Sequence, residues 1–204
     1  MKKHKSSPSC PFCSNYGISH RMIHEGEDVY VVSDLHPIIF GHLLIVTKKH
    51  HLSFGELELK SLRKIRDMII RIAKIIYCFK TNVIVFERGN KNQNTSGILS
   101  VDHAHLHLIP VSSMVSELPR KKRVAHFFEL PNYVKFSSYY FYWDIFDNLA
   151  YWGDANDIES QFIRRVSASK VGKNEWDWKR SLSIDSQAAE QSQIIKQILK
   201  RRLK

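Results

Sequence analysis

The sequence predicts an α+β fold: an antiparallel sheet with a long amphipathic helix, followed by a mixed C-terminal extension. Residues 28–33 and 42–47 have the β-branched and aromatic composition of strands. Apolar residues recur at spacings of three and four between Leu62 and Phe79, as on one face of a helix. Residues 103–109 alternate histidine with apolar side chains, which predicts a strand with two different faces.

Composition narrows the class of protein. A chain of 204 residues with 43% hydrophobic residues can bury a proper core, and no apolar run is long enough to cross a membrane. The basic N-terminus lacks the apolar segment of a secretory signal, and three cysteines make a disulfide framework improbable, so we expect a cytoplasmic protein. The net charge of +11 favours polyanionic partners, although the basic residues are spread along the chain.

The elements follow one another in a simple order. The strands at 28–33 and 42–47 are expected to pair through a turn, and Ser53 with Glu56 has the capping-box spacing of a helix start. A third strand is expected at 82–87, followed by a polar loop to residue 100. We expect a flexible leader (1–9), a first domain (10–115), a linker (116–130) and the extension with a basic terminal helix (131–204).

The extension is less regular. The aromatic residues between Tyr133 and Ile145 suit strands, and Asp157 can cap a helix that runs to about Lys170, with Gly172 as its stop.

The three histidines of the predicted strand, His103, His105 and His107, lie on one face. Three interpretations are open: buried or surface histidines without a special role, a zinc site, or nucleophilic catalysis. A neutral imidazole can attack phosphorus near pH 7, while its neighbours bind phosphate oxygens.

The pair Cys10 and Cys13 forms a CxxC in a turn. Alone it is a weak signal, because two free buried thiols and a redox site give the same pattern, and a structural zinc site needs four ligands.

The order of several motifs carries a family resemblance over roughly residues 8 to 112. His-x-His-x-His followed by two apolar residues resembles the motif of the histidine triad (HIT) superfamily of nucleotide hydrolases and transferases. Upstream, Asp34-x-x-Pro37-x-x-x-Gly41-His42 and the run to His50 are similar to the first two strands of that family, and Phe86-Glu87-Arg88-Gly89 is similar to bacterial members. The resemblance implies a HIT-like fold with the C-terminal extension as an addition.

The resemblance also implies roles. His105 would be the nucleophile that forms a nucleotidyl-histidine intermediate at the α-phosphate, and His107 would bind a non-bridging oxygen and help the leaving group depart. The nucleotide would be bound by Asp34 at the ribose hydroxyls, and by His42, Ser100 and Glu87 near the phosphate.

Two positions depart from the family pattern. Many members have Asn, a phosphate contact, where this chain has Glu87, and Gln where it has Leu99. A carboxylate at Glu87 would repel phosphate unless protonated or paired, and Arg88 could supply that pairing. Apolar residues around Val32, Leu35 and Ile45 would surround the base.

Zinc-containing branches of the family place ligands at the positions of Cys10, Cys13, His50 and His103, with His51 as an alternative ligand. The resemblance therefore implies a structural Zn²⁺. It also implies a homodimer through the long helix and a sheet edge, a surface that the extension could block or replace.

Two enzymatic functions and one binding function remain. The first is a hydrolase or nucleotidyltransferase acting on a dinucleoside polyphosphate, a nucleoside phosphoramidate or an adenylated compound. The second is a nucleic-acid-associated member that acts on adenylated DNA or capped RNA ends, and the third is a non-catalytic nucleotide-binding module. In the extension, Gln161, Arg164 or Arg165 could reach a phosphate, although adjacent arginines on a helix usually face solvent.

Overall fold

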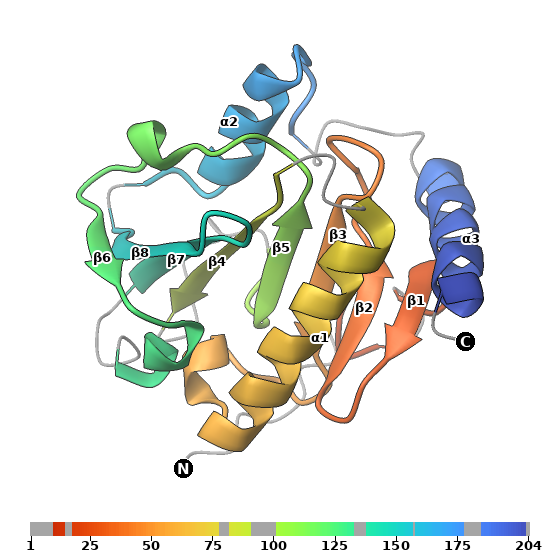
Figure 1. Cartoon of the computed structure of the whole chain (residues 1–204), viewed down its shortest axis with the longest axis horizontal. Helices are drawn as coiled ribbons and strands as arrows, with labels where there is room; N and C mark the ends of the chain where they lie inside the picture. The colour runs from red at the N-terminus through yellow and green to blue at the C-terminus, as the bar shows by residue number, and fades with distance from the viewer. Residues whose placement is uncertain are drawn as a thin grey trace.

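An eight-stranded antiparallel sheet forms the centre of the molecule (Figure 1). The computed structural model describes residues 10–14, 18–77, 82–90, 101–132, 138–156, 158–177 and 185–202. The strands are β1 (Met22–Glu25), β2 (Val29–Ser33), β3 (Leu43–Thr47), β4 (Ile84–Asn90), β5 (His105–Ile109), β6 (Lys122–Val124), β7 (Ser138–Asp144) and β8 (Leu149–Asp154), in the spatial order β1-β2-β3-β5-β4-β7-β8-β6. The helices are α1 (Leu59–Tyr77), α2 (Phe162–Lys170) and α3 (Asp185–Arg202). The α+β architecture expected from the sequence is confirmed.

The two faces of the sheet differ in character because successive side chains of a strand point to opposite sides. In β5, Leu106 and Leu108 are fully buried in the main core, into which α1 packs. His105 and His107 therefore lie on the other face, and we call this face the histidine face. The alternation expected over residues 103–109 is confirmed from His105 to Ile109, whereas His103 precedes the strand.

Helix α1 is amphipathic as expected. Leu62, Ile65 and Ile69 are buried in the core, while Arg63 and Lys64 are exposed. The helix begins at Leu59 rather than at Ser53, because a separate 3-10 helix covers Phe54–Glu56. There the Glu56 side chain accepts the backbone N–H of Leu52 at 3.0 Å, instead of closing a capping box.

The extension completes the sheet of the first half. Strand β7 pairs with β4 from Ile84–Asp144 to Asn90–Ser138, and all seven residues of β7 are buried. The expected linker, 116–130, is not one: it contains β6 and buries Leu118, Phe127 and Leu130. The basic run at 120–123 was interpreted as typical of a linker, but exposed charged residues are equally typical of an edge strand.

Helices α2 and α3 pack on different parts of the molecule (Figure 1). Helix α2 packs Ile163 and Val166 against Phe86 and Tyr140 on the histidine face. It begins at Phe162, five residues after the expected cap. Helix α3 lies beside β1 and contacts α1, and its buried residues include Ile195 and Leu199. Among the described helices, none combines the length and the apolar composition that a membrane crossing requires.

Candidate functional site

His105 lines a cavity on the histidine face, and a hydrogen bond holds its ring in one tautomer. Its Nδ1 lies 2.7 Å from the carbonyl oxygen of His103, and a carbonyl can only accept, so Nδ1 carries the proton. Nε2 of the neutral ring is then unprotonated, and burial lowers the pKa of His105 further below its usual value. The ring lines a cavity of about 160 Å³ together with His107. The local geometry is that of a nucleophile held in one tautomer.

His107 and His42 form a hydrogen-bonded pair whose protons can also be assigned. The backbone N–H of Ile38 donates to His42 Nδ1 at 3.2 Å, so His42 carries its proton on Nε2. The Nε2–H of His42 donates to Nδ1 of His107 at 3.0 Å. His107 therefore carries its own proton on Nε2, where it can serve as a donor. Burial lowers the pKa of His42 to about 4 and that of His107 well below its usual value, so both rings are neutral at pH 7.

Only one member of this pair lines the cavity. His107 does, whereas His42 is fully buried behind it. The structure thus places His42 one layer away from the expected phosphate contact. From there His42 fixes the orientation and the tautomer of His107.

Asp34 is surrounded by donors from the protein itself. Its Oδ1 accepts the backbone N–H of His36 at 2.8 Å, and its Oδ2 accepts Arg164 Nη1 at 3.0 Å. His42 Nε2 and His107 Nδ1 lie 3.5 and 3.8 Å from the same oxygen. Burial acts to raise the pKa of Asp34, but Arg164 and the two histidines hold it well below its usual range. Asp34 lines the cavity as a carboxylate that already has partners.

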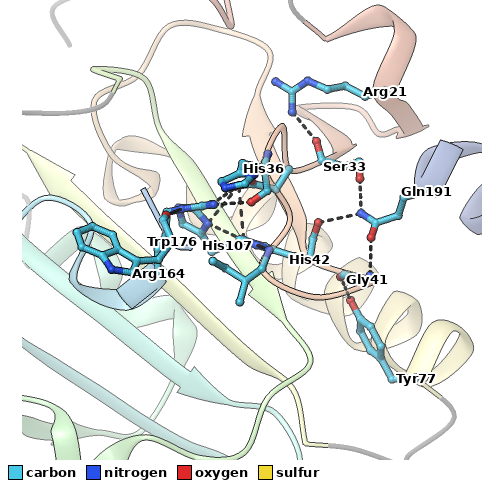
Figure 2. Close-up of polar contacts among 12 residues, drawn as sticks. Arg21, Ser33, His36, Gly41, His42, Tyr77, His107, Arg164, Trp176 and Gln191 are labelled. Carbon is cyan, nitrogen blue, oxygen red and sulfur yellow. Dashed lines mark hydrogen bonds and ion pairs between the residues drawn. The ribbon is translucent and has the colours of Figure 1, made fainter. Parts of the chain in front are cut away.

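The extension reaches into this site through α2. Arg164 is 4% exposed; it donates Nε–H to the carbonyl of Trp176 at 3.0 Å and Nη2–H to that of His36 (Figure 2). Gln161 also lines the cavity and donates to Asp177 at 2.7 Å. Arg165 points away and pairs with Glu159 at the surface. Of the three side chains singled out in the sequence, two belong to the cavity.

Helix α3 holds the loop that carries Asp34 and His42 (Figure 2). The side chain of Gln191 accepts the backbone N–H of Gly41 at 2.9 Å and donates to the hydroxyl of Ser33. Tyr77 of α1 donates to the carbonyl of Gly41 at 2.6 Å. Gly41 has φ +90°, and a Cβ there would lie 2.7 Å from the Tyr77 ring, so this turn requires glycine.

Glu87 lies on the opposite face of the sheet, which contradicts its expected role at the phosphate. Its carboxylate accepts the backbone N–H of Phe54 at 2.7 Å and the Tyr139 hydroxyl at 2.9 Å. Burial raises the pKa of Glu87 to about 7. The physical reason is the alternation along β4, which sends Phe86 and Arg88 to the cavity and Glu87 to the α1 side.

The other residues that were expected near the nucleotide are found on both faces of the sheet or outside the described residues. Arg88 does not pair with Glu87; it donates to the carbonyls of Ala155 and Ile158 in the extension. Of the residues expected around the base, Leu35 lines the cavity, while Ile45 is buried on the α1 side. The expected phosphate contact of Ser100 lies outside the described residues, as does the expected leader 1–9.

A second cluster, of metal-ligand type, adjoins the histidine strand. The ligand atoms of Cys10, Cys13, His50 and His103 lie within 4.8 Å of one another. His103 Nδ1 is 3.4 Å from one sulfur and 3.6 Å from the other, and the sulfur of Cys13 is 3.1 Å from Nδ1 of His50. A tetrahedral zinc ion separates sulfur and nitrogen ligands by about 3.5 Å, so the cluster fits the ion.

Two further contacts define this ligand set. Nε2–H of His103 donates to the carbonyl of Thr47 at 2.7 Å, which frees Nδ1 to bind a metal. His51, the alternative ligand, instead contacts Glu56 at 3.2 Å.

Comparison with known proteins identifies the family. The HIT domain model matches residues 16–114. An uncharacterized HIT-like protein of Methanocaldococcus jannaschii is 31% identical over 106 residues, which are 50% of this chain and 78% of that protein. The chain belongs to the HIT family.

Other HIT proteins are similar over the same half. The adenosine 5′-monophosphoramidase HNT1 of Candida albicans is 30% identical over 112 residues, 54% of this chain and 73% of that protein. The solved structure of a histidine triad protein from Clostridium difficile covers 54% of this chain and 96% of its own, with 24% identity and a TM-score of 0.39.

Sequence reasoning missed two residues of the site. Arg88 lies on the histidine face, which the period-2 pattern of its strand could have indicated through Phe86. Gln191 is 150 residues from its partner Gly41, and no sequence signal connects them.

Proposed function

We propose that the protein is a nucleotide hydrolase or nucleotidyltransferase that acts at an α-phosphate through a nucleotidyl-His105 intermediate. The observation that carries this proposal is the fixed tautomer of His105, whose unprotonated Nε2 belongs to a ring that lines the cavity. Membership of the HIT family and the similarity to a phosphoramidase support the same chemistry.

The reaction has two steps. Nε2 of His105 attacks the α-phosphorus, a P–N bond forms, and the bond from phosphorus to the leaving group breaks with its electron pair on the leaving group. His107 donates its Nε2–H to a non-bridging oxygen, where negative charge accumulates in the transition state. Water or another acceptor then attacks phosphorus and loses its proton to solvent, and the P–N bond breaks with its electron pair returning to Nε2 of His105.

The Cys10, Cys13, His50 and His103 cluster is proposed to hold a structural zinc ion. The ion would anchor His103, whose carbonyl oxygen receives the Nδ1–H of His105. Zinc would therefore position the nucleophile without entering the reaction. Metal analysis should find one zinc per chain in the wild type and a loss of zinc, with a lower melting temperature, in Cys13→Ser. Equal zinc content in both proteins would contradict this site.

A covalent trapping experiment tests the intermediate. The protein is incubated with diadenosine triphosphate and with adenosine 5′-phosphoramidate, each labelled at the α-phosphate, and is then denatured and separated. We expect label on the wild type and on His126→Ala, which removes an exposed histidine, and none on His105→Ala. Turnover without any label on the wild type, or label on His105→Ala, would refute the nucleotidyl-histidine mechanism.

A second candidate, action on adenylated DNA or capped RNA ends, is favoured by one surface. Arg120, Lys121, Lys122 and Arg123 are all exposed at the β6 edge, and the Lys122 ammonium lies over the Trp152 ring, 5.5 Å from its centroid. Polyanion binding there should weaken steeply with salt. Activity on free dinucleotides that DNA does not compete with would favour the first candidate instead.

The homodimer remains a prediction. Strand β7 of the extension already occupies the β4 edge of the five-stranded HIT sheet. A dimer formed through that edge would have to displace β7, so a dimeric mass in light scattering would indicate that another surface is used.

A further inference from the structure

The cavity on the histidine face carries more positive than negative charge. Among the described residues, its charged lining consists of three guanidinium groups, from Arg21, Arg88 and Arg164, and one carboxylate, from Asp34. Arg164 is balanced by Asp34 at 3.0 Å. The charged side chains that line the cavity therefore carry a net positive charge.

Arg88 is the clearest case of an unbalanced cation. Within the described part of the chain it forms no ion pair, and its only hydrogen bonds are to the carbonyls of Ile158 and, at 3.0 Å, Ala155. Its buried Nε has no hydrogen-bond partner there. Burial lowers its pKa, but a guanidinium group stays charged at pH 7. Such a group is suited to bind an anion with its remaining donors.

The position of Arg88 connects it with the reacting groups. Phe86 is paired with His107 across β4 and β5, and Arg88 is two residues further along the same face. Continuing this register places Arg88 level with His105, one strand away. The extension orients the side chain from the other side, through the two carbonyls that precede α2.

The charge balance indicates which substrates fit. The α-phosphate of a nucleoside phosphoramidate carries about one negative charge, and His107 already offers it a donor. A dinucleoside polyphosphate brings further charges next to that phosphate. We propose that Arg88 binds an anionic group of the substrate beside the phosphate that His105 attacks, so that the site favours leaving groups that are themselves phosphates. This inference rests on the proposed function and narrows its substrate class.

The test compares two substrates in four proteins: wild type, Arg88→Gln, Arg88→Lys and the surface control Arg165→Gln. For diadenosine triphosphate we expect Arg88→Gln to lower kcat/KM by roughly 10- to 100-fold, the loss typical of a hydrogen bond to a charged group. For adenosine 5′-phosphoramidate the expected loss is less than about threefold by the same argument, because the contact is absent there. Arg88→Lys should recover part of the first loss, and Arg165→Gln should match the wild type.

The ratio between the two substrates is the decisive quantity, because a folding defect would lower both activities alike. Equal losses on both substrates would overturn the inference and make Arg88 a residue that only supports the extension. Calorimetry with inorganic tripolyphosphate gives a reading that needs no turnover: we expect binding to the wild type and at least tenfold weaker binding to Arg88→Gln. If that difference is found while neither nucleotide is cleaved, the anion site stands and the proposed function fails. Equal affinities would overturn the site itself.

Discussion

The HIT half and the C-terminal extension contribute different things to one site. The HIT half supplies the groups that would react, His105 and His107, together with the metal-ligand cluster. The extension holds this half in place: Arg164 pairs with Asp34 in the cavity, Gln191 binds the loop at Gly41, and Tyr139 donates to Glu87 on the opposite face of the sheet. The family motif alone therefore does not define the site in this chain, because some of the residues that hold the site in place lie outside the matched range 16–114.

The ion pair between Arg164 and Asp34 should be the strongest of these contacts. Arg164→Met leaves a buried carboxylate without its cation, and we expect it to lower the free energy of unfolding by about 3–5 kcal/mol. The double variant with Asp34→Asn should recover part of this loss, and chemical denaturation of all four proteins measures the coupling. Strictly additive losses would show that the two halves are not coupled through this pair.

The contribution of the Arg164–Asp34 ion pair to stability should depend on pH. Because the folded pKa of Asp34 is lowered, its stabilisation is complete above the unfolded pKa of about 4 and is lost as the pH falls towards the folded value. The difference between the wild type and Asp34→Asn should therefore shrink on acidification. A difference that is constant between pH 7 and pH 3 would contradict the ionised state of Asp34.

Glu87, which accepts the Tyr139 hydroxyl, should show a smaller effect of opposite pH sign, because burial raises its pKa. The folded pKa of Glu87 is raised from 4.5 to about 7, so the folded state holds this proton more tightly and loses stability as the pH rises through that interval. Relative to the wild type, Glu87→Gln should gain about 3 kcal/mol in free energy of unfolding between pH 4 and pH 8. Thermal unfolding across this range measures it, with the exposed Glu58→Gln as a flat control.

The hydrogen bonds of Gln191 with Gly41 and Ser33 should contribute the least stability of the three contacts. Gln191→Ala leaves the buried N–H of Gly41 without its acceptor, which typically costs about 2 kcal/mol. Because the clamped loop carries Asp34 and His42, kcat should fall as well. Gln193→Ala, on the exposed side of the same helix, is the matched control. Equal stability of the two variants would mean that α3 packs on the loop without holding it.

Local patterns in the sequence predicted the HIT half well. The alternation in β5 and the spacing in α1 depend on neighbours along the chain, and the order of motifs identified the family. The expected role of Glu87 at the phosphate was wrong, because the family resemblance assigned it from the order of motifs, whereas its side chain points to the α1 side of β4. The partners of Asp34 could not be predicted, because Arg164 is 130 residues away and its direction depends on how the extension packs.

The pairing of β7 with β4 and the packing of α3 against β1 have a consequence for synthesis of the chain. The hydroxyl of Ser192 bonds to the carbonyl of Arg21, 171 residues earlier, so the last helix closes over the first strand. A nascent chain that ends before residue 138 has an open β4 edge, and unpaired edges recruit other strands. Native contacts between such distant segments form late and slowly. We therefore expect the nascent HIT half to depend on chaperones until the extension has left the ribosome.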